Sequence, residues 1–182
     1  MFKPHAWLVL LGVAGSYATT TPAVRPDASR FCSLSPPPPD TGFDPTRLVR
    51  FAQVVVLARA DSQSRTGQLP GGRTYSVVHF TVTETIDSGK MHIPVSLRVP
   101  GDVTTQPDFN PAAVPYHWVR PSGLRGSCYA SGYQQGGEFL LLLRGPSADS
   151  LDPYWAALSP TNEQVHGRDD PWVAWVRRVR HP

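Results

Sequence analysis

The stretch Glu138-Phe-Leu-Leu-Leu-Leu-Arg144 is a continuous apolar run between two charged residues. A half-buried strand alternates apolar and polar residues, whereas a run of this length without alternation is typical of a strand buried on both faces. We therefore expect a central strand here, with other elements packed against each of its faces.

Several other segments have the β-branched and aromatic composition of strands. In the segment 75–86 the composition also alternates, with Val78, Phe80 and Val82 on one face. The remaining predicted strands are 51–60, 93–99 and, as a short candidate, 154–158. Between the third and the central strand runs a long polar stretch with several prolines, at about 101–126. Such irregular insertions are often where binding occurs.

The end of the chain has the sequence signals of a helix. Asp170 followed by Pro171 predicts an N-cap and a first helical turn. The apolar residues that recur at helical spacing are Trp172, Trp175, Val176 and Val179. The two tryptophans could form a stacking platform for a ligand, but packing of the helix on the sheet is the favoured interpretation.

About five short strands followed by one helix predict a mainly β fold, a small closed five-stranded barrel of the OB type with a C-terminal helix. A flat β-sandwich is the alternative, but it usually contains more strands. We expect a single domain over 31–182, because this length suffices for one core.

The first residues indicate export. Lys3 precedes an apolar run at 6–14, and small residues follow up to Ala18, so 1–18 is predicted to be a signal peptide and 19–30 a flexible tail. The apolar run is shorter than the about 20 residues that span a bilayer, so no membrane span is expected. A buried N-terminal helix is the less favoured alternative. The predicted location is secreted, periplasmic or extracellular.

Charge and motifs exclude several function classes. The chain has 17 basic and 14 acidic side chains, and a net charge of +3 is too small to argue for nucleic-acid binding. No histidine pairs with another ligand at metal-binding spacing, and no nucleophile elbow, phosphate loop or dinucleotide fingerprint is found. Asp169 and Asp170 do not face the same way on a helix, so capping is favoured over acid–base chemistry. We predict a non-enzymatic protein without cofactor or resident metal, acting by binding another protein.

The chain has two cysteines, Cys32 and Cys128. In an exported chain a disulfide is favoured over a pair of free buried thiols. Each cysteine opens a stretch that resembles the tissue inhibitors of metalloproteinases, the netrin-module group. The N-terminal pattern of that family is matched by Cys32, Ser33, Pro36, Pro37, Pro39, Thr41 and Phe43. The second match is Cys128-Tyr-Ala-Ser-Gly-Tyr with the following Glu138-Phe-Leu. The chain departs from the pattern at Leu34 and Asp44, where the family has further cysteines.

The resemblance implies an OB-type fold, a Cys32–Cys128 bridge, and a binding site at Cys32, Ser33, Pro36 and Pro37. In those inhibitors the free α-amino group and carbonyl of the leading cysteine chelate the zinc of the protease, and the next side chain enters the substrate pocket. A zinc metalloprotease is therefore a candidate partner. Signal cleavage after Ala18 would leave Cys32 with an amide nitrogen, so inhibition requires a second cleavage. The alternative is a structural or adaptor module of the envelope or extracellular space without inhibitory activity.

Overall fold

The computed structural model describes most of the chain from Asp44 onward. The described residues are 44–68, 74–124, 126, 128–147, 151–154 and 158–182. The predicted signal peptide at 1–18 and the predicted tail at 19–30 lie outside them.

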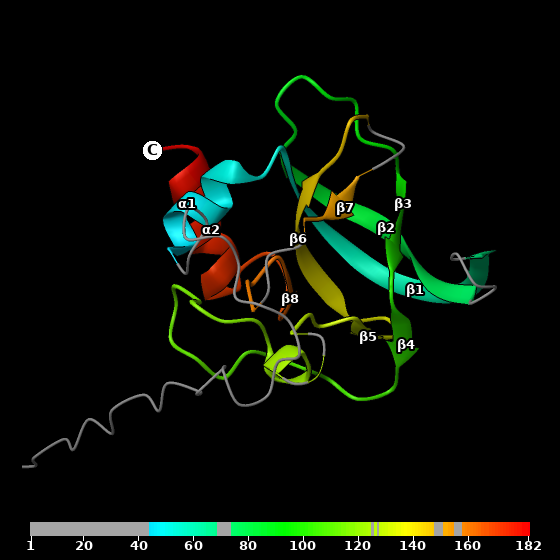
Figure 1. The fold of residues 1–182 in the computed structure, drawn as a ribbon. Helices are drawn as coiled ribbons and strands as arrows, with labels where there is room; N and C mark the ends of the chain where they lie inside the picture. The colour runs from blue at the N-terminus through cyan, green and yellow to red at the C-terminus, as the bar shows by residue number, and fades with distance from the viewer. Residues whose placement is uncertain (1–43, 69–73, 125, 127, 148–150, 155–157) are drawn as a thin grey trace, which may run out of the picture.

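A single antiparallel sheet forms most of the molecule (Figure 1). Its strands follow the order β3-β2-β1-β6-β7, and β8 also pairs with β6. Their bounds are β1 Val54–Gln68, β2 Thr74–Asp87, β3 Ser96–Pro100, β6 Glu138–Arg144, β7 Asp152–Pro153 and β8 Asn162–Val165. Because β3 and β7, at the two ends of this order, are in contact, the sheet closes into a nearly complete barrel. The predicted mainly β barrel with a C-terminal helix is confirmed, and its form is consistent with the OB type.

The predicted central strand is β6, and its two faces are both buried as expected. Phe139, Leu141 and Leu143 point into the barrel core, whereas Leu140 and Leu142 belong to a second core on the outer side of the sheet. All five side chains have no exposed surface. The neighbouring strand β1 divides its residues in the same way, with Val54, Val56, Ala58 and Ala60 inside and Val55 and Leu57 outside.

Two helices cover this outer face and lie side by side in Figure 1. The predicted C-terminal helix is α2, Pro171–Arg180, and Asp170 caps it by accepting a hydrogen bond from the Trp172 N–H at 2.8 Å. The second helix is α1, Pro45–Phe51, which begins with the same Asp-Pro pair at Asp44 and Pro45. Their buried side chains pack against the outward-facing side chains of the strands beneath. This part of the second core consists of Leu48, Val49, Ala52, Trp172, Val173 and Val176.

Three strand predictions need correction. The first strand begins at Val54 and not at residue 51, because Phe51 ends α1. The third begins at Ser96, so Val95 precedes it and is 75% exposed. No strand begins at Tyr154; the short strand is β7, and residues 155–157 lie outside the described part of the chain.

The long polar stretch joins two further short strands. These are β4, Asp102–Thr104, and β5, Gly132–Gln134, which pair with each other in parallel. The intervening residues 105–131 are here called the β4–β5 segment, and they include the 3-10 turn η3, Pro121–Leu124. Among the described residues, no helix has the length and apolar character needed to cross a membrane.

Candidate functional site

Of the predicted site residues, Cys128 lies in the described part of the chain, and Cys32, Ser33, Pro36 and Pro37 lie outside it. Cys128 is 1% exposed. It packs in a small apolar cluster with Val119, Ala130 and Leu158, apart from the two larger cores. The bridge to Cys32 stays a prediction, because Cys32 lies outside the described residues.

The backbone around Cys128 is unusual. Cys128 has φ 61° and Leu158 has φ 64°, and they are the two non-glycine residues with positive φ in the described part of the chain. The Leu158 N–H donates to the Cys128 carbonyl at 2.7 Å, and the Val119 N–H donates to the Leu158 carbonyl at 2.7 Å. A left-handed non-glycine residue costs about 1–3 kcal/mol and persists where its surroundings fix it. Backbone strain is thus concentrated at the contact between Cys128 and Leu158.

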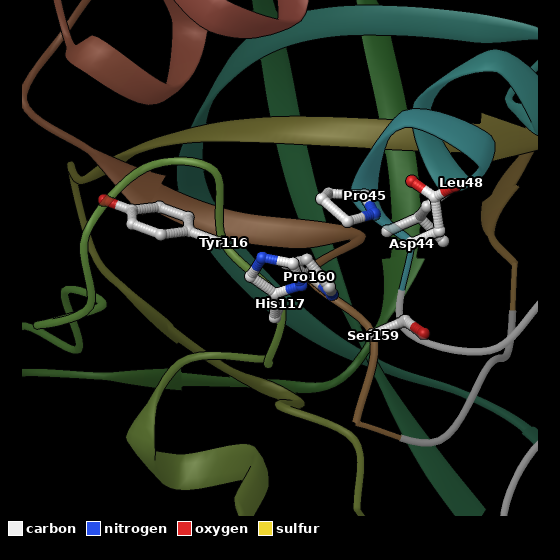
Figure 2. A pocket seen from close by; sticks show the side chains of 7 residues that line it. All are labelled: Asp44, Pro45, Leu48, Tyr116, His117, Ser159 and Pro160. Atoms are coloured by element: carbon white, nitrogen blue, oxygen red, sulfur yellow. The ribbon is translucent and has the colours of Figure 1, made fainter. Parts of the chain in front are cut away.

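A shallow hollow, shown in Figure 2, includes Ser159 and Pro160, the two residues that directly follow Leu158. It encloses no cavity, since the space of about 170 Å³ over its lining includes open solvent. The residues that line it are Asp44, Pro45, Leu48, Tyr116, His117, Ser159 and Pro160. They come from the start of α1, from the β4–β5 segment and from the residues directly after Leu158. The hollow therefore adjoins both Asp44, where residues 32–43 join the described chain, and the segments that surround Cys128.

The polar groups of the hollow are mostly engaged elsewhere. The Asp44 carboxylate caps α1 by accepting from the N–H groups of Thr46 at 2.9 Å and Arg47 at 3.4 Å. Burial, and then the carboxylates of Asp170 and Glu163, raise the pKa of Tyr116 to about 12, so its hydroxyl stays neutral. Much of the remaining wall is proline and leucine.

The β4–β5 segment also contributes to a buried polar cluster around Arg120, which has no exposed surface. Its guanidinium group donates to the Asp108 carboxylate at 2.7 Å and to the carbonyls of Asn162, Gly132 and Ala130 at 2.9, 2.5 and 3.0 Å. It also lies 5.0 Å from the centre of the Tyr133 ring. A buried cation is stable when it is paired and well hydrogen-bonded, and Arg120 has an ion-pair partner and hydrogen bonds from four of its five guanidinium N–H groups.

Glu163 on β8 is the second ionisable group of the cluster and is fully buried. Its two oxygens accept hydrogen bonds from the Arg120 backbone N–H at 2.9 Å and from the Asn110 side-chain amide at 3.0 Å. Burial raises the pKa of Glu163 to about 7, although the Arg120 charge and these hydrogen bonds act in the opposite direction.

The sequence analysis did not identify this cluster. From the sequence, the polar run at 159–164 could contact a ligand, but such side chains more often hydrogen-bond the backbone of their own loop. In the structure its last three residues form part of β8, and Thr161, Asn162, Glu163 and Gln164 are all buried. Hydropathy cannot distinguish a buried polar side chain with partners from an exposed one. The available signal was their position between the central strand and the helix.

The described residues include no group of three or more histidine, cysteine or carboxylate side chains that could hold a metal ion. The candidate site thus combines a shallow hollow beside the start of α1, backbone strain at Cys128 and Leu158, and a buried polar cluster that shares the β4–β5 segment with them. No protein-family model matches the chain, and no curated protein matches it.

Proposed function

We propose that this protein is an exported, non-enzymatic binding module that contacts another protein through the barrel end formed by the hollow and the Cys128 cluster. The proposed partner is a zinc metalloprotease, as the resemblance to the tissue inhibitors of metalloproteinases implies. One observation carries the proposal. Asp44 and Cys128, the two points that would anchor residues 33–43, adjoin the same two segments of the described chain.

The two anchor points are connected through residues 158–160. The Cys128 carbonyl is bonded to Leu158, which is followed by Ser159 and Pro160 in the wall of the hollow. Asp44 lines the same hollow. With a Cys32–Cys128 bridge, the proline-rich residues 33–43 would be tied at both ends of this barrel face.

A segment tied at both ends suits inhibition. Proline has a fixed φ, and a bridged chain has few conformations to lose on binding. Preorganisation of this kind improves affinity because it lowers the entropy cost of ordering a loop in the complex. The resemblance assigns zinc chelation to Cys32 and the pocket contact to Ser33, and Pro36 and Pro37 would stiffen the ridge behind them.

The test compares two versions of the protein against a panel of zinc proteases. One begins near Thr19, as signal cleavage after Ala18 would leave it, and the other begins at Cys32; both contain every described helix and strand. We expect the version that begins at Cys32 to inhibit at least one protease, and the tailed version to inhibit poorly because its Cys32 nitrogen is an amide. Inhibition should weaken below the pKa of the free amine, which is about 8 for an unperturbed α-amino group.

Two controls make the comparison decisive. Ser33→Arg in the version that begins at Cys32 keeps the amine but blocks the pocket contact, so it should lose inhibition. Matching melting temperatures would show that all versions are folded. If the version that begins at Cys32 is as inert as the tailed one, the inhibitor proposal fails and the adaptor alternative remains.

The adaptor alternative has its own test at the hollow. A photo-crosslinker attached to the exposed His117, at the rim of the hollow, should join the partner, whereas the same group on the exposed Ser62 of β1 should not. Equal crosslinking at both positions, or at neither, would exclude this barrel end as the binding surface.

A further inference from the structure

The buried polar cluster has an unequal count of charges. One guanidinium group, that of Arg120, faces two carboxyl groups, those of Asp108 and Glu163. Asp108 holds the ion pair directly, since its carboxylate is 2.7 Å from the guanidinium nitrogen. The Glu163 carboxyl bonds to the Arg120 backbone and to Asn110 instead. With both carboxyls ionised, the buried cluster would carry a net negative charge that nothing else in it balances.

The same cluster fastens the β4–β5 segment to β8. The Asp108 N–H donates to the Gln164 side chain at 2.8 Å, and the Asn162 side chain donates to the Ala130 carbonyl at 2.7 Å. The bonds of Glu163 to Asn110 and Arg120 lie between these two ties. The segment includes His117 and Cys128, so it supplies part of the hollow and of the cluster beside it.

We propose that Glu163, Arg120 and Asp108 form a proton-linked latch, in which a proton on Glu163 favours the closed position of the β4–β5 segment on β8. The physical reason is charge balance around Arg120 and Glu163, which have no exposed surface, whereas Asp108 is 17% exposed. A protonated Glu163 leaves one cation and one anion in the cluster, which is the combination that a low-dielectric interior tolerates best.

The groups that face Glu163 support this assignment. Arg120 lowers its pKa, Asp108 raises it, and Tyr116 stays neutral. From β6, the residue paired opposite Glu163 is the apolar Leu140. Asp170, at the start of α2, acts on Tyr116 and adds negative charge on that side. Arg120 is therefore the cation among these groups, and it already forms an ion pair with Asp108.

The direction of the pH effect follows from proton linkage. In the closed position the pKa of Glu163 is raised to about 7, whereas an exposed glutamate has the ordinary value of 4.5. Between these values the closed form binds a proton that the open form does not. Each unit by which the pH falls in this range therefore favours closing by up to about tenfold, and the effect ends above the raised pKa. If the proposed function holds, partner binding should be tighter at mildly acidic than at alkaline pH.

Hydrogen exchange of the full mature protein tests the latch without any partner. We compare protection factors corrected for intrinsic exchange rates. As the pH rises from about 5 to about 7, protection of amides in the β4–β5 segment should fall by up to about tenfold per pH unit, and above that range it should level off. Amides of β1 and β6 in the barrel core serve as the internal control. A segment whose protection does not change with pH relative to these strands would overturn the proposal.

Two variants separate a latch from a merely structural cluster. Glu163→Gln cannot ionise, so its segment should show the same corrected protection at every pH. Asp108→Asn removes the carboxylate that competes with Glu163 for the charge of Arg120. Arg120 then stabilises ionised Glu163 more strongly, so the midpoint of the pH dependence should move to lower pH. The shift can be followed as the carbon-13 signal of the Glu163 carboxyl. If Asp108→Asn weakens the segment equally at all pH values and leaves that midpoint in place, the cluster is structural and the proposal is wrong.

Because these measurements need no protease, failure of the latch and failure of the inhibitor proposal are distinguishable. A protein that inhibits but shows no pH-dependent protection would lose the latch alone, and the reverse result would lose the inhibitor proposal alone.

Discussion

Replacement of Arg120 by methionine should be among the most destabilising single changes in the chain. Methionine keeps much of the side-chain volume but removes the charge and every donor. The Asp108 carboxylate, 17% exposed, then loses its ion pair, and the carbonyls of Gly132 and Ala130 lose a donor in a buried site. Removal of one partner from a buried ion pair typically costs about 3–5 kcal/mol. Against a total stability of about 5–15 kcal/mol, this is a large fraction.

The chain contains a matched control in Arg59 and Asp61. Their side chains also form an ion pair, at 2.9 Å, but are 53% and 34% exposed. Exposed pairs of this kind contribute about 0–1 kcal/mol, because water and salt screen the charges. Arg59→Met should therefore cost little, although it removes the same chemical group as Arg120→Met.

Urea unfolding followed by tryptophan fluorescence measures both changes on one scale. We expect the midpoint of Arg120→Met to fall far below that of Arg59→Met. If Arg120→Met is unfolded without denaturant, Arg120→Lys gives a milder version, since lysine keeps the charge but cannot reproduce the planar fork of donors. Equal losses for the Arg59 and Arg120 methionine variants, both within about 1 kcal/mol, would refute the reasoning from burial.

Three further predictions concern other parts of the molecule. Peptide mapping without reduction should recover Cys32 linked to Cys128, and two free thiols in the exported protein would contradict the bridge. Trp172→Ala should cost about 3–5 kcal/mol in thermal unfolding because the side chain is fully buried, and Trp175→Ala clearly less because it is only partly buried; an unchanged melting temperature with lost partner binding would overturn the packing role. Asp44→Ala should lower the free energy of unfolding by about 1 kcal/mol because it removes the cap of α1, and Asp44→Ser should restore most of this loss. Equal stability of Asp44→Ala and the unchanged protein would contradict the capping role.

The elements that the sequence predicted well are those whose burial determines their composition. The strand β6 is covered on one face by the barrel core and on the other by the helices, so it can hold no polar residue between Glu138 and Arg144. The helix α2 combines an aspartate cap, a proline in the first turn and an apolar face, and each of these features is needed by a helix that packs on a sheet.

The elements that were missed carry weaker versions of the same signals. The Asp44-Pro45 pair repeats the start of α2, but α1 is so short that its apolar residues do not establish a helical period. The strand β1 continues past Ala60 to Gln68 through mainly polar residues. Pairing with β2 continues there although the side chains of residues 61–64 are not buried, and an apolar pattern reports burial and not pairing.

The buried cluster could not be predicted because its stability depends on contacts distant in sequence. Arg120 finds Asp108 within its own segment but Asn162 on β8, and Glu163 is bonded to Asn110 across the same boundary. A lone arginine in a polar stretch is usually exposed, so composition argues for the wrong environment. Only the fold brings these groups together.

Buried ion pairs often contribute less to stability than well-packed apolar side chains of similar volume would. An apolar replacement would, however, give the β4–β5 segment no directional bonds to β8. Arg120, Asp108 and Glu163 each bond to one or more partners at fixed positions, and the same segment includes Cys128, whose backbone is left-handed. Two costly features, buried charge and backbone strain, therefore occur at one end of the barrel. We infer that their contribution is a defined geometry of the β4–β5 segment on β8.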